Sequence, residues 1–122
     1  MKRRILWLLL AAACGVPSGP SEAEKAALCQ KNLEHLWEPL EFYMSDHQGQ
    51  YPPRLEDLAT ARSPALKEPY VKEIPPCPPG WSYAYETAPG RYTLICRGNF
   101  RAADLEEGYP RMTSEMAPTS KP

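Results

Sequence analysis

Acidic and histidine side chains that could act as general acids and bases gather in one stretch of the sequence. Three glutamates flank a histidine at spacings typical of a helix face: Glu34, His35, Glu38 and Glu41. Paired carboxylates can transfer protons, but at this spacing they line one solvent-facing side of a helix, and no nucleophile accompanies them. Ser45, Asp46 and His47 are contiguous, whereas the members of a catalytic triad converge from separate segments. The sequence therefore predicts a protein that is not an enzyme.

Sulfur and imidazole side chains raise the question of a metal site. Three cysteines with either of two histidines would supply the ligand types that Zn²⁺ prefers: Cys29, Cys77, Cys96, and His35 or His47. The cysteines do not form a Cys-x-x-Cys pair, and the ligands have no regular spacing. Three acidic residues near the C-terminus offer oxygen ligands to Ca²⁺ without a recognisable loop motif: Asp104, Glu106 and Glu107. We therefore expect no metal ion and no other cofactor.

The N-terminal segment has the pattern of an export signal. Residues 2–4 are basic, and the nine residues 5–13 are apolar and end in three alanines. A basic start, a short apolar run and small residues before a cleavage site are typical of a secretory signal peptide. The run is too short for a membrane-spanning helix, which needs about 20 residues. We therefore expect residues 1–13 to be removed during export.

Cys14 follows directly after those alanines. The segment Leu-Ala-Ala-Ala-Cys at residues 10–14 resembles the lipobox of bacterial lipoproteins. This resemblance implies that the Cys14 thiol receives a diacylglycerol and that the new N-terminus is acylated, because stable anchoring takes more than one acyl chain. Residues 14–20 would then be a lipidated cysteine and a tether, on the periplasmic or cell-surface side of a membrane. The alternative is an ordinary signal peptide and a freely exported domain.

A long amphipathic helix is predicted over residues 22–47. Ser21 and Glu24 have the spacing of a capping box, and apolar residues then recur at spacings of three and four. Pro39 lies inside this stretch, where a proline removes a hydrogen bond and clashes with the preceding turn. We therefore expect a kink near residues 35–39, or a break with Pro39 opening a second helix.

Shorter elements follow the helix. Residues 53–58 predict a short helix that begins with proline. Residues 60–80 contain six prolines and little periodicity, so they predict a loop. Residues 101–122 are polar, and we expect a poorly ordered tail there.

Two alternating segments predict a β-hairpin. Residues 81–86 and 91–96 each place aromatic or apolar side chains at every second position. A four-residue turn between them would set Tyr85 opposite Tyr92. One interpretation of the hairpin aromatics is a platform for a sugar or a peptide, and the other is a buried face packed against the helix. The aromatic residues concerned are Trp81, Tyr83, Tyr85 and Tyr92.

Export permits disulfides, and three cysteines remain if Cys14 is acylated. Cys77 and Cys96 flank the predicted hairpin and the segment that leads into it, so we expect a disulfide between them. A loop of about 20 residues closed in this way stabilises a domain by roughly 3 kcal/mol in the chain-entropy model. Cys29 would then be a small buried side chain. The alternative, in which Cys29 bridges to one of the other two, stays open.

The order of these motifs resembles a known family. Cys-x-x-Asn-Leu at residues 29–33, Leu-Glu-x-Tyr at 40–43 and Gly-x-Tyr-Pro-x-x-Leu-x-x-Leu at 49–58 precede Cys-x-Gly at 96–98. Together they are similar to the globular domain of type IV pilin-like proteins and type II secretion pseudopilins. The resemblance implies an α+β fold, one helix packed on a small antiparallel sheet, with a non-enzymatic role outside the cytoplasm. Because a lipid anchor stands in place of the apolar N-terminal helix of pilins, we do not expect an ordinary filament subunit.

Charge and composition limit the partners. Fifteen acidic and 14 basic residues give a formal net charge of −1, which offers no basic patch for nucleic acid. We therefore predict a pilin-like domain over residues 21–100 in a bacterial lipoprotein of the cell envelope, with a structural or protein-interaction role. The alternative function is a module that binds an envelope glycan or peptide through the hairpin aromatics.

Overall fold

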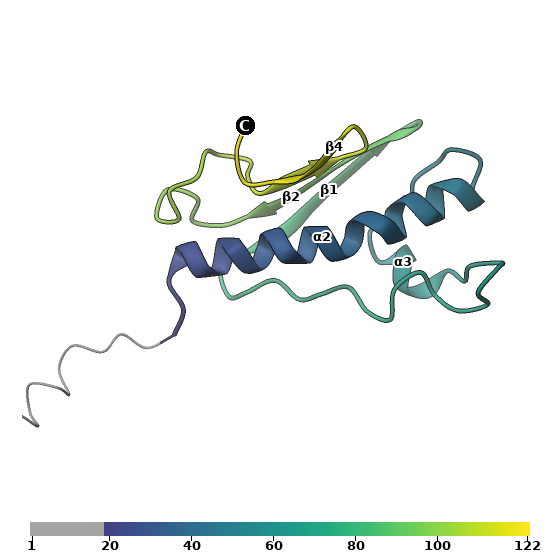
Figure 1. Cartoon of the computed structure of the whole chain (residues 1–122), viewed down its shortest axis with the longest axis horizontal. Helices are drawn as coiled ribbons and strands as arrows, with labels where there is room; N and C mark the ends of the chain where they lie inside the picture. Colours follow the sequence, from purple (N-terminus) through teal and green to yellow (C-terminus); the bar gives the residue numbers. More distant parts are fainter. Residues whose placement is uncertain (1–18) are drawn as a thin grey trace, which may run out of the picture.

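A 25-residue helix, α2 (Glu22–Asp46), runs along one face of a four-stranded antiparallel sheet in the computed structural model of the chain (Figure 1). The structure describes residues 19–122. The strands lie side by side in chain order: β1 (Ser82–Ala88), β2 (Arg91–Arg97), β3 (Arg111–Thr113) and β4 (Met116–Thr119). The predicted α+β class, one long helix on a small antiparallel sheet, is confirmed. The predicted signal peptide and the lipid site at Cys14 lie outside the described residues.

The capping box at the start of α2 is formed as predicted. Ser21 Oγ accepts a hydrogen bond from the Glu24 amide at 3.2 Å, and Glu24 Oε1 accepts one from the Ser21 amide at 2.9 Å. The helix continues through Pro39 without interruption, so the predicted break is wrong and the expected kink is not confirmed. Leu36 and Leu40, on either side of the proline, are fully buried. Their burial stabilises both turns, because tertiary packing supplies most helix stability in proteins.

The hairpin of β1 and β2 is present, but its register differs from the predicted one. Only Pro89 and Gly90 separate the paired ends of the strands, and Tyr85 lies opposite Leu94 instead of Tyr92. Gly90 has a φ of 74°, which suits a two-residue hairpin turn. Because the error is a shift of two residues, each side chain stays on the predicted face of the sheet.

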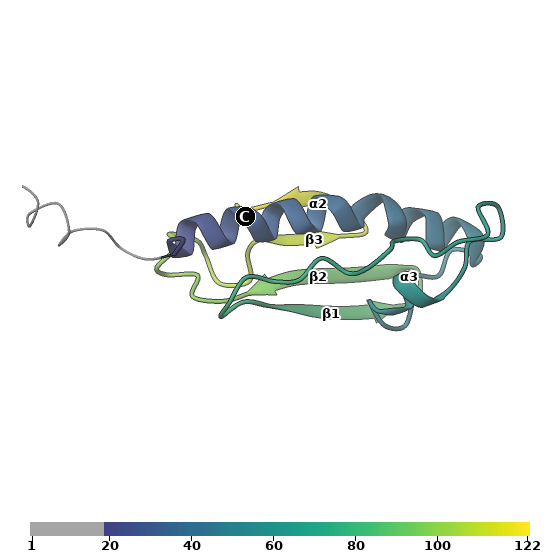
Figure 2. The same cartoon turned by 90° about the horizontal axis from the view of Figure 1, so that it is seen from below.

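The segment between α2 and the hairpin is mostly irregular. Helix α3 (Asp57–Thr60) is shorter and begins later than the predicted helix over residues 53–58. Residues 54–57 form a turn instead, in which the Asp57 carboxylate accepts a hydrogen bond from the Arg54 amide at 3.1 Å. Residues 61–80 form a loop as predicted, and this loop runs beside α2 (Figure 2).

The C-terminal residues differ most from the sequence-based expectation. Strands β3 and β4 lie within residues 101–122, where a poorly ordered tail was expected. Met112 on β3 is fully buried, and its neighbour across the ladder is Leu94 on β2. Ser120 Oγ donates a hydrogen bond to Gln30 on α2 at 3.0 Å. These contacts make the C-terminal segment part of the helix–sheet core.

Candidate functional site

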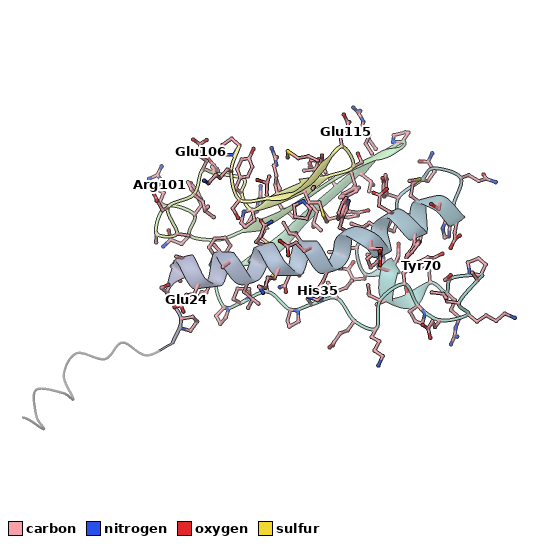
Figure 3. The ribbon with its side chains drawn as sticks, viewed as in Figure 1. Glu24, His35, Tyr70, Arg101, Glu106 and Glu115 are labelled. Atoms are coloured by element: carbon pink, nitrogen blue, oxygen red, sulfur yellow. The ribbon has the colours of Figure 1, made fainter. Side chains whose placement is uncertain are left out.

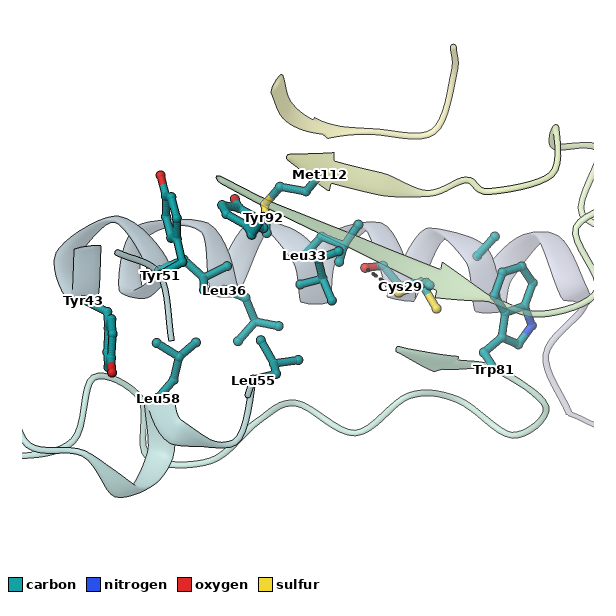
Figure 4. Close-up of a cluster of buried hydrophobic side chains, with 14 of the residues drawn as sticks. Cys29, Leu33, Leu36, Tyr43, Tyr51, Leu55, Leu58, Trp81, Tyr92 and Met112 are labelled. Carbon is teal, nitrogen blue, oxygen red and sulfur yellow. Dashed lines mark hydrogen bonds between the residues drawn. The ribbon is translucent and has the colours of Figure 1, made fainter. Parts of the chain in front are cut away.

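Three thiols converge in the core from three separate segments. Cys29 belongs to α2, Cys96 to β2, and Cys77 to the loop that precedes β1. All three are free cysteines. The exposed fraction is 0% for Cys29 and 1% for Cys96, whereas Cys77 is half-buried. Figure 4 shows Cys29 in the buried cluster between Leu33 and Trp81.

Two hydrogen bonds hold the Cys77 segment against the helix and the sheet. The Tyr83 hydroxyl on β1 donates to the Pro75 carbonyl at 2.6 Å. The Asn32 side-chain amide on α2 donates to the Pro76 carbonyl at 3.0 Å. The sequence Pro-Pro-Cys-Pro-Pro at residues 75–79 restricts the backbone further, since each proline fixes its own φ. Cys77 is therefore a positioned residue although it lies in a loop.

Cys96 is the common neighbour of the other two thiols. Its Sγ lies 3.8 Å from the Cys29 carbonyl oxygen, to which it donates a hydrogen bond, and Cys77 packs against the buried cluster that contains both residues. The hydrogen bond from Cys96 lowers the pKa of the Cys29 thiol. The same contact, followed by burial, raises the pKa of Cys96, and burial raises the pKa of Cys77.

The predicted disulfide between Cys77 and Cys96 is not formed in the structure. The two residues are neighbours, as their places beside the hairpin indicated, but each carries a free thiol. The alternative bridges from Cys29 are not formed either. Sequence spacing did not show that Cys77 packs against the cluster that contains Cys29 and Cys96, because the position of Cys77 depends on side-chain hydrogen bonds from Tyr83 and Asn32.

The two histidines do not join the thiols. His35 is exposed on α2 (Figure 3). His47 stacks on Tyr43 with 3.7 Å between ring centroids, and its Nδ1 is 2.8 Å from the Tyr43 carbonyl oxygen. Across residues 19–122, no group of three or more His, Cys, Asp or Glu side chains is arranged to hold a metal ion. The acidic side chains considered for calcium are exposed: Asp104, Glu106 and Glu107.

The acidic residues of α2 have separate roles. Glu34 and Glu38 are exposed. Glu41 accepts a hydrogen bond from the Tyr51 hydroxyl at 2.9 Å, and Asp46 accepts one from the Tyr70 hydroxyl at 2.7 Å. These carboxylates therefore tie the following loops to the helix and do not converge on a common point.

The hairpin aromatics face the core side of the sheet. Trp81 is 5% exposed and Tyr92 is 2% exposed. Tyr83 and Tyr85 are half-buried, and the Tyr85 hydroxyl donates to the Pro52 carbonyl at 2.7 Å. At the hairpin tip an open hollow is bordered by Tyr85 and Tyr92, together with Arg91. The Tyr92 hydroxyl is buried there without a hydrogen-bond partner.

Gly98, the glycine of the Cys-x-Gly motif, lies directly against the Trp81 ring. A Cβ atom at this position would overlap the indole ring of Trp81. The ring therefore packs directly on the Gly98 backbone, and its Nε1 donates to the Glu22 carboxylate at 3.1 Å. These contacts fix the end of the hairpin against the first turn of α2.

An apolar surface at the C-terminal end of α2 was not predicted from the sequence. Phe42 is 53% exposed and Leu66 is 62% exposed. With Tyr70 they line a hollow of about 320 Å³ between the helix and the 61–80 loop. We call Phe42, Leu66 and Tyr70 the distal surface. Phe42 lies outside the apolar stripe of α2. A large aromatic residue on the polar side of an amphipathic helix is the sequence signal that could have predicted this surface.

Comparison with protein-family models, with curated proteins and with solved structures finds no match for this chain. Of the helices in residues 19–122, none has the length and apolar character that crossing a membrane requires.

Proposed function

We propose that this chain is a lipid-anchored, non-enzymatic protein of the bacterial envelope whose pilin-like domain docks a protein partner. The lipobox-like segment that ends at Cys14 supports the anchor. The long helix on an antiparallel sheet, together with the order of the motifs, supports the pilin-like description.

The placement of the distal surface supports a docking role. Only residues 15–21 separate Cys14 from the first residue of α2. A helix of 25 residues is about 37 Å long at 1.5 Å per residue. Phe42 lies near the C-terminal end of α2, so the distal surface is at the opposite end of this helix from Glu22 (Figure 1). An anchored domain would therefore hold this surface away from the membrane.

The observation that carries the docking proposal is the exposure of Phe42 and Leu66 beside one hollow. Scattered apolar side chains are normal on protein surfaces, but adjacent ones around a concavity are typical of interaction sites. The hollow is lined mainly by apolar side chains, with Asp46 and Ser63 among the polar ones. A protein partner with its own apolar side chain would fill it.

Binding of a glycan or peptide by the hairpin aromatics is the second candidate. The unpartnered Tyr92 hydroxyl and the hollow at the hairpin tip favour it. It has the weaker support, because Trp81 and Tyr92 present almost no ring surface to solvent. A ligand stacking on these rings would require the hairpin to move away from the helix.

Two measurements test the proposal. Metabolic labelling with palmitate should label the full chain and should not label the Cys14→Ser variant. A photo-cross-linking residue at Leu66 should give one defined adduct in intact cells, and one at Glu115, exposed at the tip of the β3–β4 turn, should give none. The Leu66 adduct should disappear with Phe42→Ser while the far-UV circular dichroism stays unchanged.

An unlabelled chain would overturn the lipid anchor. Equal adducts from Leu66 and Glu115, or a Leu66 adduct that persists with Phe42→Ser, would overturn docking at the distal surface. Adducts that form only between copies of this chain would assign the surface to self-association.

A further inference from the structure

We propose that Cys77, Cys96 and Cys29 form a thiol–disulfide relay that carries oxidation from solvent into the core. An external disulfide reacts at Cys77, and the resulting bond moves inward until it closes between Cys96 and Cys29. This inference does not depend on the proposed docking function, because it rests on the arrangement of the three thiols alone.

Access to solvent determines where the relay begins. Cys29 and Cys96 are 0% and 1% exposed, so an external disulfide cannot reach their sulfur atoms without opening of the core. Cys77 is half-buried and lies on the loop side of the cluster. Thiol–disulfide exchange needs direct contact between the attacking sulfur and the disulfide. Cys77 is therefore the one described thiol that can react first.

Positioning determines that the bond moves on to Cys96. The Pro75 and Pro76 carbonyls accept hydrogen bonds from Tyr83 on β1 and Asn32 on α2, which keeps Cys77 at the cluster. In the antiparallel ladder Tyr83 pairs with Cys96. The residue that fixes the Cys77 loop is thus the direct cross-strand neighbour of the second thiol. Cys96 in turn points its thiol at the Cys29 carbonyl, 3.8 Å away.

The relay balances as three exchange steps. The Cys77 thiolate attacks an external disulfide RSSR, which forms a Cys77–SR mixed disulfide and releases RS⁻. Cys96 attacks the Cys77 sulfur, which forms Cys77–Cys96, and its proton passes to the departing second RS group, which leaves as RSH. Cys29 then attacks the Cys96 sulfur, and its proton passes to the departing Cys77 sulfur, which becomes a thiol again. Overall, two protein thiols lose two electrons and two protons, and one RSSR becomes two RSH.

Burial makes the Cys29–Cys96 bond the end point. A Cys77–Cys96 bond keeps one sulfur within reach of external thiols, so it can be reduced again. A Cys29–Cys96 bond lies wholly in the core and is protected from external thiols. Cys29 is held at the Cys96 segment, because its carbonyl oxygen lies 3.8 Å from Cys96 Sγ. After the attack by Cys29, Cys77 is a free, half-exposed thiol once more.

The relay predicts a specific product with oxidised glutathione. The protein is the full chain carrying Cys14→Ser, so that only the three cluster thiols react. Incubation with excess oxidised glutathione should yield one internal disulfide and one glutathione adduct per chain. Peptide mapping by mass spectrometry should place the disulfide at Cys29–Cys96 and the adduct at Cys77.

Three variants in the same background test the individual steps. Oxidation of Cys77→Ser should proceed at about one tenth of the parent rate or below, because no accessible thiol remains. Cys96→Ser should take one adduct at Cys77 and form no disulfide. Cys29→Ala should stop at Cys77–Cys96 and carry no adduct.

The protein that retains all three thiols tests the relay even if a variant with a substituted core cysteine fails to fold. A final Cys77–Cys96 bond without an adduct would overturn the last step of the relay. Adducts on Cys29 or Cys96, or oxidation of Cys77→Ser at the same rate as the parent, would overturn the assignment of Cys77 as the first site.

Discussion

At the scale of single residues, tyrosine hydroxyls join the irregular segments to the helix and the sheet. Tyr51 donates to Glu41 on α2, Tyr83 to the Pro75 carbonyl and Tyr85 to the Pro52 carbonyl. Each hydrogen bond offsets the free-energy cost of removing the tyrosine hydroxyl from water. Tyr92 is the exception, since its buried hydroxyl has no partner in the structure.

This contrast predicts opposite outcomes for two similar substitutions. Tyr83→Phe should lower the free energy of unfolding by about 1 kcal/mol, because it removes a good hydrogen bond to Pro75. Tyr92→Phe should leave stability unchanged or raise it slightly, because it removes a buried group without a partner. Urea unfolding followed by circular dichroism measures both. Equal losses would show that the Tyr92 hydroxyl has a partner in solution.

The Tyr51 hydroxyl also predicts how stability depends on alkaline pH. Burial, and then the hydrogen bond to Glu41, raise the pKa of Tyr51 to about 12 from its ordinary 10. Because the folded protein holds this proton more tightly than the unfolded chain, the stabilisation is complete below pH 10. It is lost as the pH rises from 10 through about 12.

The free energy of unfolding should therefore fall more steeply for the parent than for Tyr51→Phe between about pH 10 and pH 12. A Tyr51→Phe variant as steep as the parent would exclude a tightly held proton at Tyr51.

At the scale of elements, the chain is predictable where structure is locally determined. The bounds of α2 follow from a capping box and an apolar stripe, both of which are visible within a few residues. The hairpin register depended on whether the turn had two residues or four, and Thr87 and Ala88 fit either a turn or a strand. The cluster thiols were identified from the sequence, but their mutual contact was not, because it depends on bonds between residues far apart in the chain.

Pro39 provides a test of how α2 is stabilised. Pro39→Ala should raise the free energy of unfolding by about 1–3 kcal/mol, because the helix continues through this residue and would regain a backbone hydrogen bond. Glu38→Ala, an exposed change at the preceding position, should alter it by less than about 0.5 kcal/mol. Thermal and urea unfolding measure both. A destabilised Pro39→Ala would mean that packing of the half-buried proline ring outweighs the missing hydrogen bond.

At the scale of the whole molecule, the C-terminal segment completes the fold. Residues 101–122 gave only a weak sequence signal, because β3 has three residues and β4 has four. Such short strands carry almost no periodicity, and their pairing depends on β2 being in place. Met112 nevertheless lies fully buried beneath α2 together with Leu94. Strand β3 therefore contributes a buried side chain to the core between the helix and the sheet.

Truncation tests this dependence directly. A chain that ends at Glu107 loses β3, β4 and Met112. Loss of a buried methionine side chain alone costs about 2–5 kcal/mol, and the strands add backbone pairing with β2. Because a domain is stable by only about 5–15 kcal/mol, the shortened chain should lack a cooperative unfolding transition.

The matched control ends at Thr119 and keeps all four strands, so that among the hydrogen bonds to α2 only that of Ser120 to Gln30 is lost. It should unfold cooperatively, with a free energy lower by about 1 kcal/mol. Limited proteolysis should separate the two chains in the same way, since only the shorter one would be degraded throughout. Cooperative unfolding of the chain that ends at Glu107 would instead show that residues 21–107 form a folding unit without β3 and β4. Strands β3 and β4 would then pack against the helix without being required for a stable fold. A reason other than stability would be needed for the burial of Met112.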